Sequence, residues 1–172
     1  MPFLWGVFIK EEIMIFVTVG SQKFQFDRLL KKVDELVENG EIECPVFAQS
    51  GASMYIPKHY QYKAYLDRDE FAQMMEQCDI VITHGGTGAI VSAVKQKKKV
   101  IAVPRIAEYG EHVDNHQLQL LKEFEKQNMI YACYDCNELD EAIKNIQTCN
   151  YSSLVSNTDK WIKSISDFIE SL

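Results

Sequence analysis

Short apolar runs alternate along this chain with longer segments in which apolar residues recur at helical spacing. The first run, residues 15–19, is rich in β-branched residues and ends at a glycine, so it predicts a buried strand. Apolar residues then recur every three or four positions from Phe26 to Val37, and Asn39-Gly40 follows as a helix-ending pair. The chain is therefore predicted to open with a strand followed by a helix.

The same strand-then-helix unit repeats as far as residue 146. Further strands are predicted at residues 45–49, 60–66, 79–83, 100–103 and 129–132, and further helices around residues 71–75, 89–96, 118–124 and 139–146. Asp67 or Asp69 is the predicted N-cap of the first of these helices. Strands that alternate with helices form a parallel sheet covered on both faces, so the predicted fold class is α/β, with a Rossmann-like sheet.

The two ends of the chain differ from this repeating part. A last helix is predicted from about Asn157 or Thr158. Its apolar residues form one stripe: Trp161, Ile162, Ile165, Phe168, Ile169 and Leu172. The stripe could dock onto the chain's own sheet. Alternatively it could bind a partner, because the α/β unit looks complete without this helix. We therefore divide the chain into an N-terminal extension (1–13), an α/β domain (14–150) and a C-terminal amphipathic helix (151–172).

Composition is that of a soluble globular protein, with 47% apolar and 25% charged residues among 172. The formal net charge of −7 disfavours nucleic-acid binding. No apolar run approaches the roughly 20 residues of a membrane span. Residues 1–13 are apolar but lack the basic start and the cleavage site of a signal peptide. They could be an upstream start, an appended arm, or a contact with a membrane or a partner.

The five cysteines have no disulfide-framework spacing, so reduced thiols in a cytoplasmic protein are expected. Cys133 and Cys136 form a C-x-x-C pair, for which chance spacing competes with a metal or redox role. A zinc site needs four ligands, and the sequence offers no second pair at a suitable spacing. No metal site is therefore expected.

A glycine-rich turn follows the strand predicted at residues 79–83. His84-Gly85-Gly86-Thr87-Gly88 leaves the carboxyl end of that strand and opens a helix. Ligands of open parallel sheets bind outside these strand ends. Glycines let the backbone approach a ligand, and free N–H groups together with the helix dipole favour phosphate oxygens. The turn is therefore a candidate phosphate site, with a tight turn for helix packing as the alternative.

A polar cluster follows the next predicted strand, which leads into Pro104-Arg105. The loop beyond it carries Glu108, Tyr109, Glu111, His112, Asp114, Asn115, His116 and Gln117. Amide side chains both donate and accept hydrogen bonds, which suits the hydroxyls of a sugar or a ribose. Asp114 could instead be a helix N-cap, and His112 or His116 an ordinary surface residue.

Two other segments are interpreted from the edge of the sheet on which they lie. Gly20-Ser21-Gln22 follows the first predicted strand on the ligand edge, and could line a cleft that faces another domain or subunit. It lacks the G-x-G-x-x-G fingerprint, which argues against a dinucleotide-dependent oxidoreductase. Lys97-Lys98-Lys99 lies on the opposite edge, where a solvated loop is expected and an anionic membrane surface is the alternative.

Four segments resemble one known family. V-T-V-G-S at 17–21, T-H-G-G-T-G at 83–88, V-P-R at 103–105 and Y-G-E-H-V-D-N-H-Q at 109–117 resemble the carboxyl-terminal, donor-binding half of GT-B glycosyltransferases of family 28. The resemblance spans roughly residues 14–147. It is strongest to the stand-alone, Alg13-like subunits and to their bacterial counterparts of the PssE, EpsF and CpsG type in exopolysaccharide and capsule synthesis.

The resemblance implies a UDP-sugar as donor substrate and no cofactor. Residues 84–88 would face the diphosphate or the sugar, and Arg105 would line the cleft. Residues 115–117 would face the sugar or its phosphate. The full set of donor-binding residues expected from the turn, the loop and this resemblance is Gly20, Ser21, His84, Gly85, Gly86, Thr87, Gly88, Arg105, Glu111, His112, Asn115, His116 and Gln117.

One departure from the family pattern concerns the ribose. Many family members carry a ribose-gripping glutamate on the helix after the glycine turn, and the matching position here is Ala93, beside Ser92. Glu108 or Glu111 could take over that role.

The resemblance also implies that this chain works as part of a heteromer. The expected activity is that of an inverting hexosyltransferase acting on a lipid-linked acceptor, together with an Alg14-like, PssD-type membrane-associated subunit. The chain would then be cytoplasmic and peripheral to the inner face of the membrane through that partner. The sequence offers no general base with an orienting partner, so no catalytic residue is predicted and the acceptor half would supply the base. The alternative is a non-catalytic subunit that stabilises a partner enzyme, and exposed apolar surface could drive homo-oligomerisation of the isolated chain.

Overall fold

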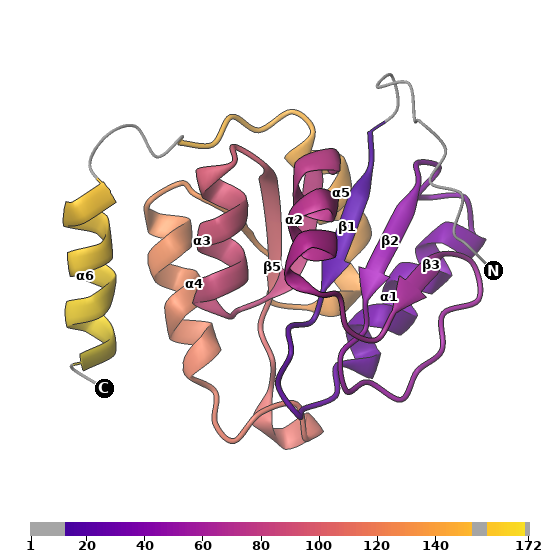
Figure 1. Ribbon diagram of the computed structural model, residues 1–172, viewed down its shortest axis with the longest axis horizontal. Coiled ribbons are helices and arrows are strands. Elements are labelled where there is room, and N and C mark those ends of the chain that lie inside the picture. Colours follow the sequence, from indigo (N-terminus) through magenta and orange to yellow (C-terminus); the bar gives the residue numbers. More distant parts are fainter. Residues whose placement is uncertain (1–12, 153–157, 171–172) are drawn as a thin grey trace.

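A computed structural model describes residues 13–152 and 158–170 of the chain. Their strands form one parallel sheet in the order β3-β2-β1-β4-β5-β6 (Figure 1). The strands are β1 (Ile15–Thr18), β2 (Val46–Gln49), β3 (Gln61–Lys63), β4 (Ile80–His84), β5 (Lys99–Val103) and β6 (Tyr131–Ala132). The helices are α1 (Asp27–Glu38), α2 (Arg68–Gln77), α3 (Thr87–Lys95), α4 (His116–Lys126), α5 (Leu139–Ile146) and α6 (Thr158–Glu170), with 3-10 turns η1 (Ala107–Tyr109) and η2 (Cys136–Glu138). The predicted α/β, Rossmann-like fold is confirmed.

Helices cover both faces of the sheet because successive side chains of each strand point to opposite sides. Ile15 and Val17 of β1 pack in a cluster with α1 and α5, whereas Phe16 packs on the other face with α2, α3 and α4. Figure 1 shows these two layers, with α2 and α3 on the near side of the sheet and α1 and α5 behind it. The continuous apolar strands of the sequence are thus explained by burial on both faces.

The strand order changes direction at the middle of the sheet. β1 pairs with both β2 and β4, so the chain first builds one half of the sheet outward from β1 and then returns to build the other half. Such a switch point leaves a crevice at the carboxyl ends of the two central strands, because the loops that follow them turn to opposite sides.

Several element boundaries differ from the sequence prediction. α3 begins at Thr87, two residues earlier than expected, so Thr87 and Gly88 belong to its first turn. Asp67 is the N-cap of α2, forming a reciprocal capping box with Glu70. β3 is a short, exposed edge strand. The N-cap of α4 is Asn115, not the alternative Asp114.

The predicted terminal helix is present as α6 and lies beside α4 (Figure 1). Ile165 packs against the apolar cluster of that face, while Ile162 and Ile169 are 51% and 47% exposed. The stripe is therefore only partly covered by the chain itself. The side chain of Trp161, and the expectations for residues 1–12 and Leu172, lie outside what the structure describes, and the division into domains stays a prediction. Among the described helices, none has the length and apolar character needed to span a bilayer.

Candidate functional site

A cleft of about 1260 Å³ opens at the carboxyl ends of β1 and β4, at the switch point of the sheet. Its floor is residues 84–89, where β4 passes into α3. Its first wall is residues 20–22 of the β1–α1 loop, and its second wall is His112 with residues 114–117 of the β5–α4 loop. A third wall is formed by Leu66, Asp67, Arg68 and Phe71 at the start of α2. All predicted donor-binding residues except Arg105 and Glu111 line this cleft.

The backbone amides of the floor fall into two groups. The N–H of Gly85 donates to Gln117 Oε1 at 3.0 Å, and the N–H of Gly86 donates to His84 Nδ1 at 3.0 Å. These two groups are already used within the protein. α3 has no side-chain cap, and no acceptor from the described residues meets the N–H groups of residues 87–89. The free donors at the floor are therefore the first turn of α3, where the helix dipole also favours an anion.

His84 is held as a neutral donor. Burial, followed by the nearby positive charges of Arg105 and His112, lowers its pKa to about 3. Because Nδ1 accepts the Gly86 N–H, the single proton of the neutral ring sits on Nε2. A floor with a neutral N–H donor beside a free helix end suits an anionic oxygen.

Two glycines are required by the His84 ring. A Cβ on Gly86 would lie 2.1 Å from His84 Cε1, and a Cβ on Gly20 would lie 2.6 Å from His84 Nε2. Gly20 also has a φ of +79°, in the left-handed region. The glycines of the turn thus make room for a histidine, which the sequence alone did not indicate.

Gln117 links two strand ends rather than pointing freely into the cleft. Its side chain is 4% exposed, and Oε1 accepts the N–H groups of Gly85 and Arg105, each at 3.0 Å. Its Nε2 lies 3.5 Å from His84 Nδ1. The amide therefore fixes the end of β4 against the end of β5.

The second wall also contains a histidine held by a carboxylate. His116 Nδ1 contacts Asp114 Oδ1, and His112 Nδ1 lies 3.3 Å from the same oxygen. Such a pair resembles a base with an orienting partner, which the sequence analysis did not find. The ligand atoms of these three residues lie within 4.8 Å of one another, so they could hold a divalent cation, although hydrogen bonds already keep them together.

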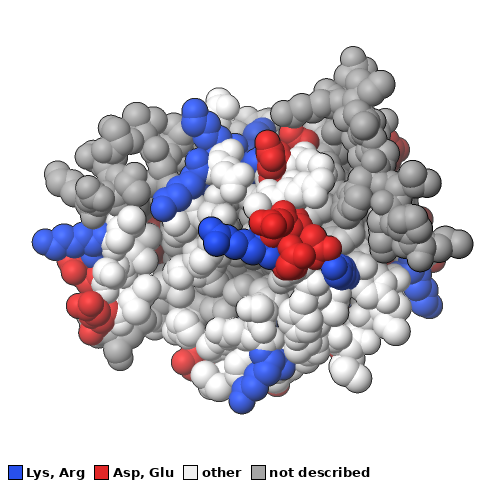
Figure 2. Space-filling view, in the orientation of Figure 1, with Lys and Arg blue, Asp and Glu red and all other residues white. Residues whose placement is uncertain are grey.

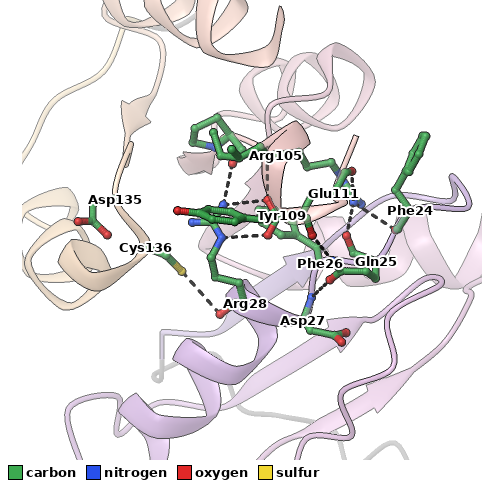
Figure 3. A network of polar contacts seen from close by, with 12 residues as sticks. Phe24, Gln25, Phe26, Asp27, Arg28, Arg105, Tyr109, Glu111, Asp135 and Cys136 are labelled. Atoms are coloured by element: carbon green, nitrogen blue, oxygen red, sulfur yellow. Dashed lines mark hydrogen bonds and ion pairs between the residues drawn. The ribbon is translucent and has the colours of Figure 1, made fainter. Parts of the chain in front are cut away.

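Arg105 and Glu111 lie behind the cleft, which differs from the prediction. Arg105 is 2% exposed and Glu111 1% exposed. The guanidinium of Arg105 donates to backbone carbonyls, and Glu111 pairs with Arg28 (Figure 3). Sequence spacing placed both residues after a strand end, but it could not indicate that their charges are satisfied inside the protein.

No expected substitute for the ribose-binding glutamate reaches the cleft. Ala93 is fully buried against the sheet. Glu108 is bonded to Asn115 Nδ2 outside the cleft, and Glu111 is buried. Asn115 in turn accepts the N–H of Ala107 at 2.8 Å, so its amide mainly holds the loop.

The third wall was missed by the sequence analysis. Leu66 and Phe71 give this wall an apolar surface. Among the described residues that line the cleft, Arg68 is the one with a lysine or arginine side chain. The signal was available, because a capping sequence directly follows the third predicted strand, whose carboxyl end lies at the same edge of the sheet. On the face in Figure 2, acidic and basic side chains are mixed rather than gathered into a patch of one sign.

The remaining candidates lie away from the cleft. Burial raises the pKa of the Cys133 thiol to about 12 and that of Cys136 to about 11, and both thiols donate to backbone carbonyls. Lys98 Nζ donates to the carbonyls of Glu76 and Cys78 at the end of α2, on the opposite edge of the sheet. These residues have structural contacts that explain their places.

The switch-point cleft, with a free helix N-terminus as its floor, defines a Rossmann-like domain of the ligand-binding class. Residues 14–172 match the family model described as glycosyltransferase family 28 C-terminal domain. The chain belongs to this family.

Similar proteins agree with that assignment. The UDP-N-acetylglucosamine transferase subunit ALG13 of Mus musculus is 26% identical over 130 residues, which cover 69% of this chain and 10% of that protein. An NMR structure of ALG13 has a TM-score of 0.57 at 17% identity and covers 88% of this chain and 94% of its own. The Streptomyces glycosyltransferase SsfS6, solved with thymidine diphosphate, has a TM-score of 0.57 at 16% identity, over 82% of this chain and 34% of its own. The chain thus spans about a tenth of the length of the mouse relative, and the solved structures support the fold.

Proposed function

We propose that this chain is the donor-binding subunit of a two-component inverting glycosyltransferase. It takes the sugar from a UDP-sugar and passes it to a lipid-linked acceptor in exopolysaccharide, capsule or glycolipid synthesis. The catalytically complete enzyme includes an Alg14-like, membrane-associated subunit, and this chain is peripheral to the inner face of the membrane through that partner. Family membership and the ALG13 relatives support a UDP-sugar as donor.

One observation carries the proposal: the uncapped first turn of α3 forms the floor of the switch-point cleft. In this proposal the N–H groups of residues 87–89 and His84 Nε2–H bind the diphosphate. Charge develops on that diphosphate as the glycosidic bond to it breaks, so preorganised donors stabilise the leaving group. Leu66 and Phe71 of the third wall offer an apolar surface for the uracil base of the nucleotide.

The sugar then lies against the second wall. His116 and Asn115 line that wall where α4 begins, and they are assigned to the sugar or its phosphate; the Asn115 amide, which already bonds Ala107 and Glu108, also holds the loop in place. In this proposal the general base comes from the partner subunit, and His116, held by Asp114, contacts the sugar instead. Inversion needs no covalent intermediate on this chain.

The test is calorimetry of the isolated chain with UDP, combined with amide NMR. We expect weak binding, since half of the cleft belongs to the partner, and shifts centred on residues 84–89. UMP, which lacks the second phosphate, is the matched control and is expected to bind more weakly. Absence of heat and of shifts at saturating UDP contradicts the proposal.

A second experiment separates a catalytic from a stabilising subunit. The membrane partner is first recovered by pull-down from the native host. The chain is then co-expressed with that partner, and transfer is measured with UDP-sugars. The double variant His84→Ala, Asn115→Ala is expected to abolish transfer. Full activity of that complex would instead favour the non-catalytic subunit.

A further inference from the structure

A polar network joins the β1–α1 loop, α1 and the β5–α4 loop (Figure 3), and these two loops carry the first and second walls of the cleft. Its centre is Arg105, the second residue after β5 ends at Val103. The guanidinium donates to the carbonyls of Val19, Phe24 and Gln25 in the β1–α1 loop, and to the carbonyl of Glu111 in its own loop. One side chain therefore holds the backbone of both walls.

Glu111 provides the negative charge of this network. Arg28 Nε and Nη2 donate to its two carboxylate oxygens at 2.9 and 3.0 Å, and the N–H of Ile106 donates to Oε2 at 2.9 Å. Arg28 Nη2 also donates to the carbonyl of Pro104 at 3.0 Å. The bidentate geometry fixes Arg28 of α1 against the β5–α4 loop. We name Arg28, Arg105 and Glu111 the brace.

The brace depends on the single carboxylate. Burial would by itself lower the pKa of Arg28, but the hydrogen bond and charge of Glu111 leave it raised. Burial lowers the pKa of Arg105 to about 10, so its guanidinium is still charged at neutral pH. Arg28 and Arg105 both lie over the Phe26 ring, and Arg105 is 2% exposed, so removing the carboxylate leaves two cations without the charge that offsets them, which is a costly arrangement. The loops would then separate to let water in.

Both walls contain residues next in sequence to backbone groups that the brace holds or to Glu111 itself. Gly20 to Gln22 lie between two carbonyls held by Arg105, and His112 directly follows Glu111. A displacement of either loop therefore moves a wall. The floor is attached separately, since Gln117 connects Gly85 to the backbone N–H of Arg105.

We propose that Glu111, acting through Arg28 and Arg105, is a positioning residue that fixes the first wall of the cleft against the second before the nucleotide binds. This inference rests on the proposed function. If only a fraction of molecules holds both walls in place, the apparent affinity falls to that fraction of its full value. The brace touches no ligand and acts only through the loops.

The test compares UDP affinity of Glu111→Gln with that of a matched buried-carboxylate variant, Asp34→Asn. Asp34 is 2% exposed and accepts from Tyr55 Oη and from the N–H groups of Lys58 and His59, away from the cleft. Glu111→Gln is expected to weaken UDP binding by about tenfold, whereas Asp34→Asn changes it less than about twofold. Both are expected to lower the melting temperature, and binding is measured well below it.

Amide NMR provides a readout that stability alone does not move. In free Glu111→Gln, signals of residues 20–22 and 112–116 are expected to shift or broaden, while UDP still shifts residues 87–89 at saturation. Should Glu111→Gln fail to fold, UDP affinity is measured for Arg28→Met instead. This variant is expected to fold more readily, because Arg28 is 26% exposed and Glu111 still accepts the N–H of Ile106. UDP affinity equal to that of the unaltered chain, or an equal loss in Asp34→Asn, overturns the inference. Absence of UDP binding by the unaltered chain removes the proposed function as well.

Discussion

At the scale of single residues, the site depends on which hydrogen-bonding groups are free and which are already used. Gly85 and Gly86 look like phosphate donors in the sequence, yet their N–H groups are bound by Gln117 and His84. The available donors belong to the three residues that follow. Composition and spacing located the turn, but its open amides depend on two side chains, one from His84 within the turn and one from Gln117, 32 positions away.

The protonation of His84 gives a pH dependence of stability. Its pKa is about 3 in the folded chain, below the ordinary value of 6.5, so the unfolded chain binds more protons between these values. The contribution of neutral His84 to the free energy of unfolding is therefore complete above pH 6.5. It is lost as the pH falls toward 3, and the free energy of unfolding then changes by at most about 1.4 kcal/mol per pH unit.

The test compares urea unfolding of the unaltered protein and of His84→Asn at pH 7.5, 6.0 and 5.0. Asparagine keeps an acceptor for the Gly86 N–H but does not titrate. The free energy of unfolding of the unaltered protein is expected to fall more steeply with acid. Parallel pH profiles would contradict a neutral, buried His84.

A pair of glycine variants tests the packing of the floor. In Gly86→Ala the new methyl group would lie 2.1 Å from His84 Cε1, so the ring or the turn must move, at a cost of about 1–3 kcal/mol. In Gly88→Ala the methyl group meets nothing within 4 Å, and the helix gains up to about 1 kcal/mol. Urea unfolding of both variants measures the difference, and equal stability of the two would be inconsistent with this packing.

At the scale of elements, hydrophobic periodicity was sufficient to place the strands and helices of the domain. It failed mainly at ends, where a helix start depends on hydrogen bonds rather than on apolar spacing. α3 begins two residues early because Gly86 has an extended backbone and can serve as its N-cap. The third wall has a different explanation, because the Asp67 cap at the start of α2 was predicted but was not connected with the edge of the sheet that carries the cleft.

The start of α2 offers a direct test of capping. Asp67 accepts the N–H groups of Asp69 and Glu70, each at 2.9 Å, and Glu70 accepts the N–H of Asp67. Asp67→Ala is expected to destabilise the protein by about 1 kcal/mol, because two helix donors lose their acceptor. Asp69→Ala, in the same first turn but outside the cap, should cost less than half of that. Chemical denaturation ranks the two, and the reverse order would show that Asp69 is the effective cap.

At the scale of the whole molecule, the sequence was sufficient for the parallel sheet and for the edge at which the cleft opens. It could not predict the brace, whose partners are separated by more than 80 positions, as Arg28 is from Glu111. Charged residues near strand ends look alike in sequence whether they line a cleft or support its walls. Burial, which depends on the complete fold, distinguishes them.

Ligand binding to the folded chain alone should raise its stability. At a UDP concentration of one hundred times Kd, the free energy of unfolding is expected to increase by about 2.7 kcal/mol, since the unfolded chain has no cleft. The same concentration of UMP should give a smaller increase, because the α3 amides then lack the second phosphate. Urea unfolding with each nucleotide measures both, and equal increases would count against a diphosphate site at the floor.

The central position of β1 has a consequence for biosynthesis. β1 is translated before both of its neighbours in the sheet, β2 and β4, and before Gln117, which supports the floor. An apolar strand therefore stays unpaired on one side while residues 19–79, which separate it from β4, are translated. A product truncated before Gln117 would carry the glycine turn without its support, and is expected to aggregate rather than accumulate as a smaller nucleotide-binding protein.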